Sequence, residues 1–126
     1  MRRGQVATEF LLVMGFVGFV LFAYLLIALT LQQDAIADEQ QVAAERLAAQ
    51  IRQELVTASV VMDGYRREFS IPEAVRNRPV EVLARPAAVI VRVGDQQFFM
   101  RTPAYNGSPQ TGVNVLRKED GEVFFE

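Results

Sequence analysis

The 126-residue chain contains no cysteine and no histidine. Without thiols it forms no disulfide and no thiolate metal site, so an exported form would depend on packing or assembly for stability. Without imidazole or thiol groups it also lacks the commonest general bases, nucleophiles and transition-metal ligands. The remaining carboxylates show no spacing typical of a catalytic pair. We therefore expect a protein that is not an enzyme and that uses no metal or other cofactor.

The chain also lacks a large excess of charge of either sign. Thirteen basic and fifteen acidic residues give a net charge of −2, and Lys118 is the single lysine. This balance gives no indication of a general nucleic-acid partner. The length allows one modest domain in addition to a membrane helix.

One long stretch of the sequence, in contrast, contains no charge at all. The run from Phe10 to Leu31 has 22 residues, and as a helix it would span roughly 33 Å, enough to cross a hydrocarbon core. A secretory signal peptide is one interpretation, since Ala35-Ile36-Ala37 resembles a cleavage site, but its apolar core would be shorter. A single-span anchor is another.

The charges around the apolar run fit an anchor with its N-terminus in the cytoplasm. Arg2 and Arg3 precede the run, whereas Asp34, Asp38 and Glu39 follow it, in agreement with the positive-inside rule. Neither interpretation explains Glu9, because a carboxylate at the edge of a membrane helix costs free energy unless it lies at the interface or finds a partner.

The segment from Arg3 to Leu11, RGQVATEFL, resembles the class III signal of archaeal type IV pilin-like proteins. In that family a basic leader ends in glycine and a prepilin peptidase cuts before glutamine. Gly4, Gln5 and Glu9 stand at the matching places, while Ala7 stands where the family often has serine. The resemblance implies a leader over residues 1–4 and a cut between Gly4 and Gln5.

The resemblance also implies an assembly role for Gln5 and Glu9. The cut would create an α-amino group on Gln5, and in this family that amine is thought to meet the glutamate of a neighbouring subunit. A buried carboxylate with a close cation is tolerable where a lone carboxylate is not. Alternatively, Glu9 lies at the headgroup level near its helix N-terminus, where negative charge is favoured.

After the apolar run the chain becomes polar but keeps a helical period. Neither proline nor glycine occurs from Leu31 to Asp63, and Gly64 is a suitable helix stop. The pattern predicts one helix from about Gln5 to Asp63. Its second half shows apolar residues on one face: Ile36, Ala43, Leu47, Ile51, Leu55, Ala58 and Met62. A two-chain coiled coil would explain this stripe less well than packing against a sheet of the same molecule, because alanine fills several positions of the seam.

From Tyr65 the period changes to two, which is typical of strands. Turn signals at Gly94-Asp95 and Asp120-Gly121 separate alternating segments. We expect an antiparallel meander of five or six strands with one face on the helix. The predicted fold is therefore α+β, and the resemblance implies that it is type IV pilin-like. Its parts are a leader (1–4), an apolar helix (5–31), an amphipathic continuation (32–63) and an antiparallel β head (64–126).

Three local features of the head remain open to two interpretations each. The aromatic pairs in Phe98-Phe99-Met100 and Phe124-Phe125 fit core and edge packing better than an adhesive patch. The basic pairs Arg66-Arg67 and Arg117-Lys118 fit a solvated face or an intersubunit ion pair better than a ligand site. Asn106-Gly107-Ser108 matches the N-glycosylation pattern in a predicted loop, although Pro109 follows it.

Together with these observations, the resemblance implies a structural subunit of an archaeal type IV pilus-like surface filament, formed as a helical homopolymer through the N-terminal helix. The resemblance implies prepilin peptidase, an assembly platform and its ATPase as partners. The protein would lie in the cell membrane before assembly and in the extracellular filament afterwards. The alternatives are a single-span membrane-anchored binding module and a minor pilin outside the filament body.

Overall fold

A computed structural model describes residues 2–126, with side chains from Gly4 onward. The chain divides into two compact units, an N-terminal unit that ends at Ile36 and a head unit from Ala37 to Glu126. Met1 and the side chains of Arg2 and Arg3, which belong to the predicted leader, lie outside the described part.

One helix, α1 (Arg2–Val60), begins in the N-terminal unit and ends in the head. The prediction of one long helix is confirmed, although its last residue is Val60 rather than Asp63. Gly64 follows with φ +93°, in the left-handed region that glycine adopts without strain. Met62 is 86% exposed beyond the helix end. The prediction that Met62 belongs to the packed stripe is therefore wrong.

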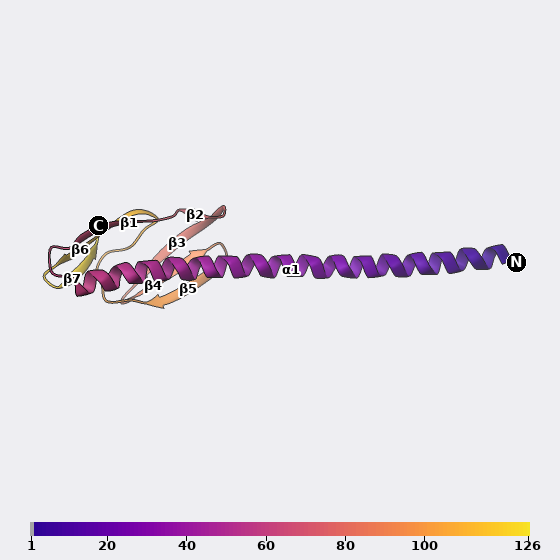
Figure 1. Ribbon diagram of the computed structural model, residues 1–126, viewed down its shortest axis with the longest axis horizontal. Helices are drawn as coiled ribbons and strands as arrows, with labels where there is room; N and C mark the ends of the chain where they lie inside the picture. The colour runs from indigo at the N-terminus through magenta and orange to yellow at the C-terminus, as the bar shows by residue number, and fades with distance from the viewer. Residues whose placement is uncertain (1) are drawn as a thin grey trace. The chain divides into compact units, whose positions relative to one another are not determined.

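Seven strands form two antiparallel sheets in the head unit (Figure 1). Their bounds are β1 (Arg66–Ile71), β2 (Ala74–Val75), β3 (Arg78–Arg85), β4 (Ala88–Val93), β5 (Gln96–Arg101), β6 (Gly112–Glu119) and β7 (Glu122–Phe125). The strand orders are β1-β6-β7 and β2-β3-β4-β5. The predicted single meander is wrong for β1, which pairs with β6 instead of the next strand in sequence. The helix-plus-antiparallel-β class is confirmed.

The turns explain where the hairpins form. Asp120 and Gly121 have φ values of 50° and 80° between β6 and β7, so both central residues adopt the left-handed conformation of a type I′ turn. Arg76 and Asn77, with φ values of 47° and 64°, do the same between β2 and β3. The first turn was predicted from Asp-Gly. The second escaped prediction because arginine rarely occupies that conformation.

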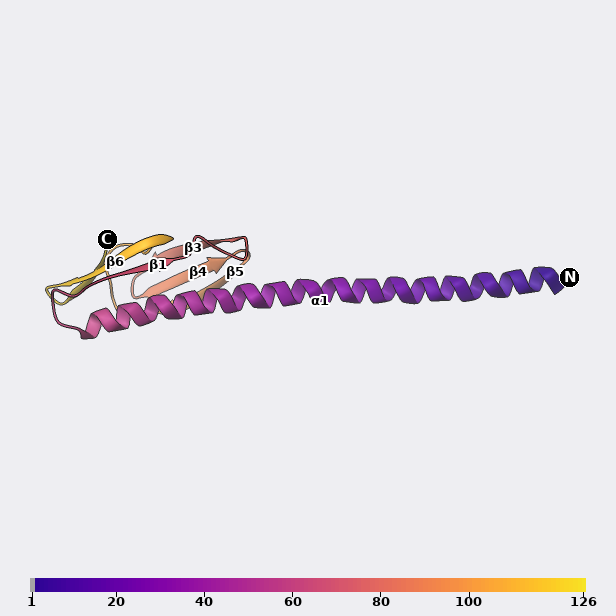
Figure 2. The same ribbon diagram turned by 45° about the horizontal axis from the view of Figure 1, so that its top comes forward.

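The head core lies between the C-terminal part of α1 and the two sheets, which both run beside that part of the helix (Figures 1 and 2). Leu47, Ile51 and Leu55 recur at helical spacing and are buried. They meet the inward face of β4, on which Val89 and Val91 are fully buried. The predicted packing of the stripe against the molecule's own sheets is confirmed.

The N-terminal end of the predicted apolar stripe is not packed in the core as expected. Ile36 is 48% exposed, whereas Gln40 is buried. The Gln40 side chain lies over the turn between β4 and β5, where its Oε1 accepts a hydrogen bond from the Asp95 backbone N–H at 3.4 Å. A Cβ on Gly94 would stand 2.9 Å from that oxygen. The core thus begins with a polar contact that a hydrophobic pattern does not reveal.

The aromatic residues of the head fall mainly on the inward side. Phe98 and Met100 pack against the core, while Phe99 between them is 56% exposed. Phe125 packs edge-on against Phe69 and Tyr105. Its ring centroid lies 6.2 Å from that of Phe69 and 5.3 Å from that of Tyr105. Alternation therefore places every second aromatic residue in the core, as predicted, and leaves Phe99 outward.

The C-terminal end of α1 is held by a lysine from β6. Lys118 Nζ donates hydrogen bonds to the carbonyl oxygens of Ser59 and Val61, both at 2.7 Å. These carbonyls belong to the end of the helix, where no later turn can supply a donor. The backbone of Lys118 also pairs with Gly64 and Tyr65. The single lysine is therefore a helix cap and a link between the helix and the three-stranded sheet.

Candidate functional site

The first candidate site is the surface of the N-terminal unit. Large apolar side chains are exposed in every direction around the helix between Val6 and Leu31. For example, Phe10, Leu11 and Leu12 point to three different sides and are 61%, 69% and 69% exposed. A helix that is apolar on all sides requires a lipid or protein environment. The described part of α1 contains one stretch long and apolar enough to cross a membrane.

The polar groups of this stretch are few. Thr30 Oγ1 donates to the Ile27 carbonyl at 2.8 Å, and Gly15 and Gly18 add no polar group. A Cβ built on Gly15 or Gly18 would meet no atom within 4 Å, so both glycines open the helix surface to a close neighbour. Small residues allow helix backbones to approach each other within a membrane. The segment is therefore suited to helix–helix packing.

The residues of the predicted processing site lie within the first turns of α1. Gly4 and Gln5 are helical, and the Gly4 carbonyl accepts a hydrogen bond from Thr8 Oγ1 at 2.9 Å. Both Gly4 and Gln5 are exposed. The peptide bond between them is thus accessible on the surface of the helix. Cleavage at this bond remains a prediction.

Glu9 stands one turn after Gln5 and immediately before the apolar run. Its side chain is exposed, and no salt bridge joins it to another side chain within residues 4–126. At i, i+4 spacing, Gln5 and Glu9 share one side of the helix. The geometry therefore places an exposed carboxylate at the border of the apolar part of the helix.

Comparisons with known proteins gave no match. No protein-family model matches the chain, and no curated protein or solved structure is similar to it at a significant level.

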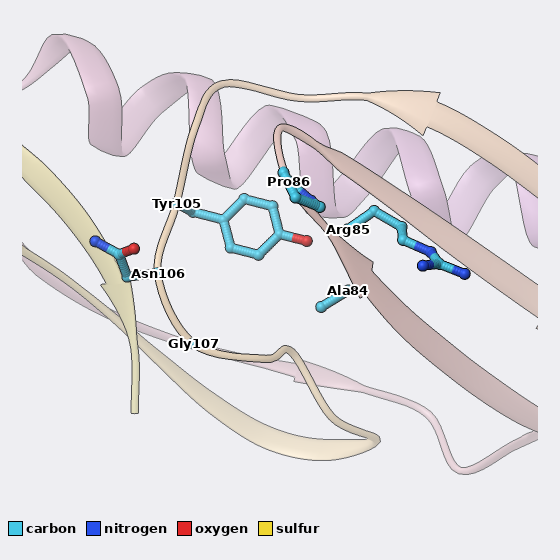
Figure 3. A pocket seen from close by; sticks show the side chains of 6 residues that line it. All are labelled: Ala84, Arg85, Pro86, Tyr105, Asn106 and Gly107. Carbon is cyan, nitrogen blue, oxygen red and sulfur yellow. The ribbon is translucent and has the colours of Figure 1, made fainter.

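The second candidate site is an open pocket of about 330 Å³ in the head (Figure 3). It lies where the β5–β6 connection meets the turn between β3 and β4. Tyr105 and Asn106 come from the connection, and Arg85 and Pro86 come from the end of β3 and the turn. In Figure 3 the Tyr105 ring points toward Pro86, whereas the Arg85 guanidinium points away from it.

Tyr105 connects the two sheets through this region. Its hydroxyl donates to the Ala88 carbonyl at 2.7 Å, at the start of β4, and its ring packs on Phe125 of β7. The next residue, Asn106, exchanges backbone hydrogen bonds of 2.8 Å with Val123 and Phe125. The pocket wall is therefore a structural connection between sheets, and sequence reasoning had assigned Tyr105 no role.

Asn106, the predicted glycosylation residue, has an exposed side chain. Its Nδ2 donates to Glu122 Oε2 at 2.9 Å. Gly107 beside it has φ +91°, and a Cβ there would lie 2.7 Å from the Phe125 carbonyl oxygen. The motif is thus accessible but held against the edge of β7. Glycosylation at Asn106 remains a prediction.

The two basic pairs lie in different surroundings. Arg67 Nε is 2.9 Å from Glu54 Oε2 on α1, and Arg117 pairs with Glu119 and Glu126 at 3.0 and 3.2 Å. Lys118 is buried, so its interpretation as a residue of a solvated face is wrong. Lys118 stands two residues after the buried Leu116 on β6, so both side chains point to the same, inward side of the strand. Within residues 4–126 no group of three or more carboxylates stands close enough to hold a metal ion.

Tyr105 makes the stability of the head sensitive to alkaline pH. Burial raises the pKa of its hydroxyl above 10.0, and the Arg85 backbone opposes part of this shift. Because the pKa is raised in the folded state, the protonated Tyr105 hydroxyl stabilises the fold fully below pH 10. This stabilisation is lost as the pH rises through the pKa of the folded state. We expect Tyr105→Phe to cost about 1 kcal/mol at pH 8 through the lost hydrogen bond. The variant should then lose less stability than the parent between pH 8 and pH 11.

Urea denaturation in detergent at both pH values would measure this difference. Tyr65→Phe is the matched control because it removes a hydroxyl elsewhere in the head. An equal loss of stability in parent and Tyr105→Phe between the two pH values would contradict the expectation.

Proposed function

We propose that this chain is the structural subunit of an archaeal type IV pilus-like surface filament, polymerised through its N-terminal helix. The observation that carries the proposal is the combination of an all-round apolar helix with a polar N-terminal turn that contains Gly4, Gln5 and Glu9. A small α+β head that follows in the sequence supports it. Neither part suggests catalysis, and we propose that the protein is not an enzyme.

In the proposed mechanism the helix first lies in the membrane, with Arg2 and Arg3 on the cytoplasmic side. A prepilin peptidase removes residues 1–4. Gly4 assists this step because a helical glycine is about 1 kcal/mol less favourable than alanine, which lowers the cost of unwinding the first turn. The cut also removes the carbonyl that accepts the Thr8 hydroxyl. An assembly platform and its ATPase then move the helix from lipid into a bundle of helices.

Assembly replaces lipid contacts by helix packing without exposing apolar surface. Lipid tails are as apolar as leucine, so the association depends on close packing and on polar contacts rather than on the hydrophobic effect. Gly15 and Gly18 permit the close approach. The polar contact that stabilises the association is the one between Glu9 and the new amine of Gln5 on a neighbouring subunit.

The intact mass of the exported protein tests the processing step. We expect the mass of a chain that starts at Gln5, without residues 1–4. Gly4→Leu should block the cut and leave the full-length precursor in the membrane fraction, whereas Gly15→Leu is a matched control that should leave the cut unaffected. A retained Met1, or a start near Asp38, would refute the proposed processing.

Electron microscopy of material sheared from cells separates the filament subunit from its alternatives. A filament whose major band is this chain supports the proposal. Absence of the chain from filaments, with the protein retained in membranes, would favour the single-span binding module. A trace of the chain in a filament of another major protein would favour the minor pilin.

A further inference from the structure

The outward faces of the two head sheets carry opposite charge. In the four-stranded sheet, Val89, Val91 and Val93 point into the core, so the alternate positions face outward. The outward face of β3, β4 and β5, here named the basic face, carries three arginines against one glutamate. These residues are Arg85, Arg92, Arg101 and Glu81.

A row of apolar side chains crosses the middle of the basic face. Leu83 stands opposite Ile90, and Ile90 stands opposite Phe99, so the three side chains are cross-strand neighbours. Leu83 is 42% exposed and Phe99 56% exposed. An exposed apolar row with a polar border is the composition of a contact surface.

The three-stranded sheet has the complementary composition. Leu116 and Lys118 point inward on β6, so Val113, Val115 and Arg117 face outward. The outward face of β1, β6 and β7, here named the acidic face, carries four glutamates against two arginines. These are Glu68, Glu119, Glu122, Glu126, Arg66 and Arg117. Val113, near the start of β6, is 66% exposed on this face.

After the ion pairs within each face are counted, each face keeps two charges without an ion-pair partner, positive on the basic face and negative on the acidic face. On the basic face Arg92 pairs with Glu81 at 3.2 Å. On the acidic face Arg117 pairs with Glu119 and Glu126, and Arg66 Nη2 lies 3.9 Å from Glu126. No ion pair between described side chains includes Arg85, Arg101, Glu68 or Glu122. The surplus is therefore two positive charges on one face and two negative charges on the other.

We propose that the basic face of one copy of this chain docks on the acidic face of the next copy. The apolar row meets the Val113 region, and Arg85 and Arg101 meet the surplus glutamates. Because the two faces are different, the contact is heterologous and can repeat from copy to copy without closing. The inference rests on the proposed filament, since helices in one bundle bring the heads of neighbouring copies together. The docking of heads is a second contact, separate from the helix bundle.

The absence of cysteine makes a direct test possible. The full chain with Phe99→Cys and Val113→Cys has one thiol on each face. Under mild oxidation of membranes or filaments we expect a ladder of dimers, trimers and longer species on a non-reducing gel. Each single variant should remain monomeric. Phe99→Cys with Glu73→Cys, in the β1–β2 connection, is the control for random collision.

The outcomes distinguish this inference from the proposed function. Filaments without a ladder would overturn the head contact and leave the filament proposal intact. A ladder in membranes of cells that form no filament would support the head contact and contradict the filament proposal. A strong dimer from Phe99→Cys alone, without higher species, would indicate a symmetric contact and overturn the inference.

Charge reversal gives an independent measure. Arg85→Glu with Arg101→Glu should lower the yield of the ladder about tenfold, because attraction between the faces becomes repulsion. Adding Glu68→Arg and Glu122→Arg to the same chain should restore most of the yield. An unchanged ladder in the first variant, or no recovery in the second, would contradict the assigned pairing of the faces.

Discussion

Replacing Lys118 with methionine is expected to lower the free energy of unfolding of the head by about 2–4 kcal/mol. The ammonium group of Lys118 donates to the Ser59 and Val61 carbonyls at the end of α1. A cation at a helix C-terminus also interacts favourably with the helix dipole. Methionine keeps the length and apolar stem of lysine, so the loss reports the two hydrogen bonds and the charge rather than a cavity.

Two variants define this measurement. Lys118→Arg keeps the charge, but its planar guanidinium cannot reproduce both contacts of the ammonium group, and we expect a loss between those of the parent and Lys118→Met. Arg117→Met is the matched control, because it removes the neighbouring charge from exposed ion pairs and should cost at most about 1 kcal/mol.

Urea denaturation in detergent, followed by the near-ultraviolet circular dichroism of the tyrosines, gives all three values. Equal stability of Lys118→Met and Arg117→Met would show that the cap contributes nothing. Hydrogen exchange of the Val56–Val60 amides adds a local measure, since fraying of the helix end should accelerate it in Lys118→Met alone.

The sequence was informative about local structure and less so about long-range pairing. The 3.6-residue period predicted the helix, and alternation with Asp120-Gly121 predicted the β6–β7 hairpin, because each signal lies within a few residues. The pairing of β1 with β6 joins segments more than 40 residues apart. No local pattern encodes such a partner, so the chain was read as a single meander.

The candidate sites were predictable to different degrees. Gly4, Gln5 and Glu9 form a contiguous motif that can be recognised in the sequence. Lys118 was missed because a basic pair next to an acidic turn resembles solvated surface. The signal that could have found it is alternation, since Lys118 shares its side of the strand with Leu116. Tyr105 gave no signal, because its partners Ala88 and Phe125 come from distant strands.

The largest functional effect is expected at Glu9. If the carboxylate meets the Gln5 amine of a neighbouring subunit, Glu9→Ala leaves that amine buried without a partner. Breaking a buried ion pair in this way costs about 3–5 kcal/mol, which corresponds to at least about a hundredfold weaker addition of each subunit. We therefore expect few or no filaments from Glu9→Ala, with membrane insertion and the cut at Gly4–Gln5 intact.

Glu9→Gln separates charge from shape in the same assay, because it keeps the size of the side chain and removes only the charge. We expect it to fail in assembly as Glu9→Ala does. Asp34→Ala is the matched control, since it removes an exposed carboxylate from the other end of the apolar run and should leave filaments unchanged. Filament yield by electron microscopy, together with the intact mass of the membrane-bound protein, distinguishes failed assembly from failed processing. Normal filaments from Glu9→Gln would mean that Glu9 contributes no ion pair and lies at the headgroup level, where a neutral side chain serves equally well.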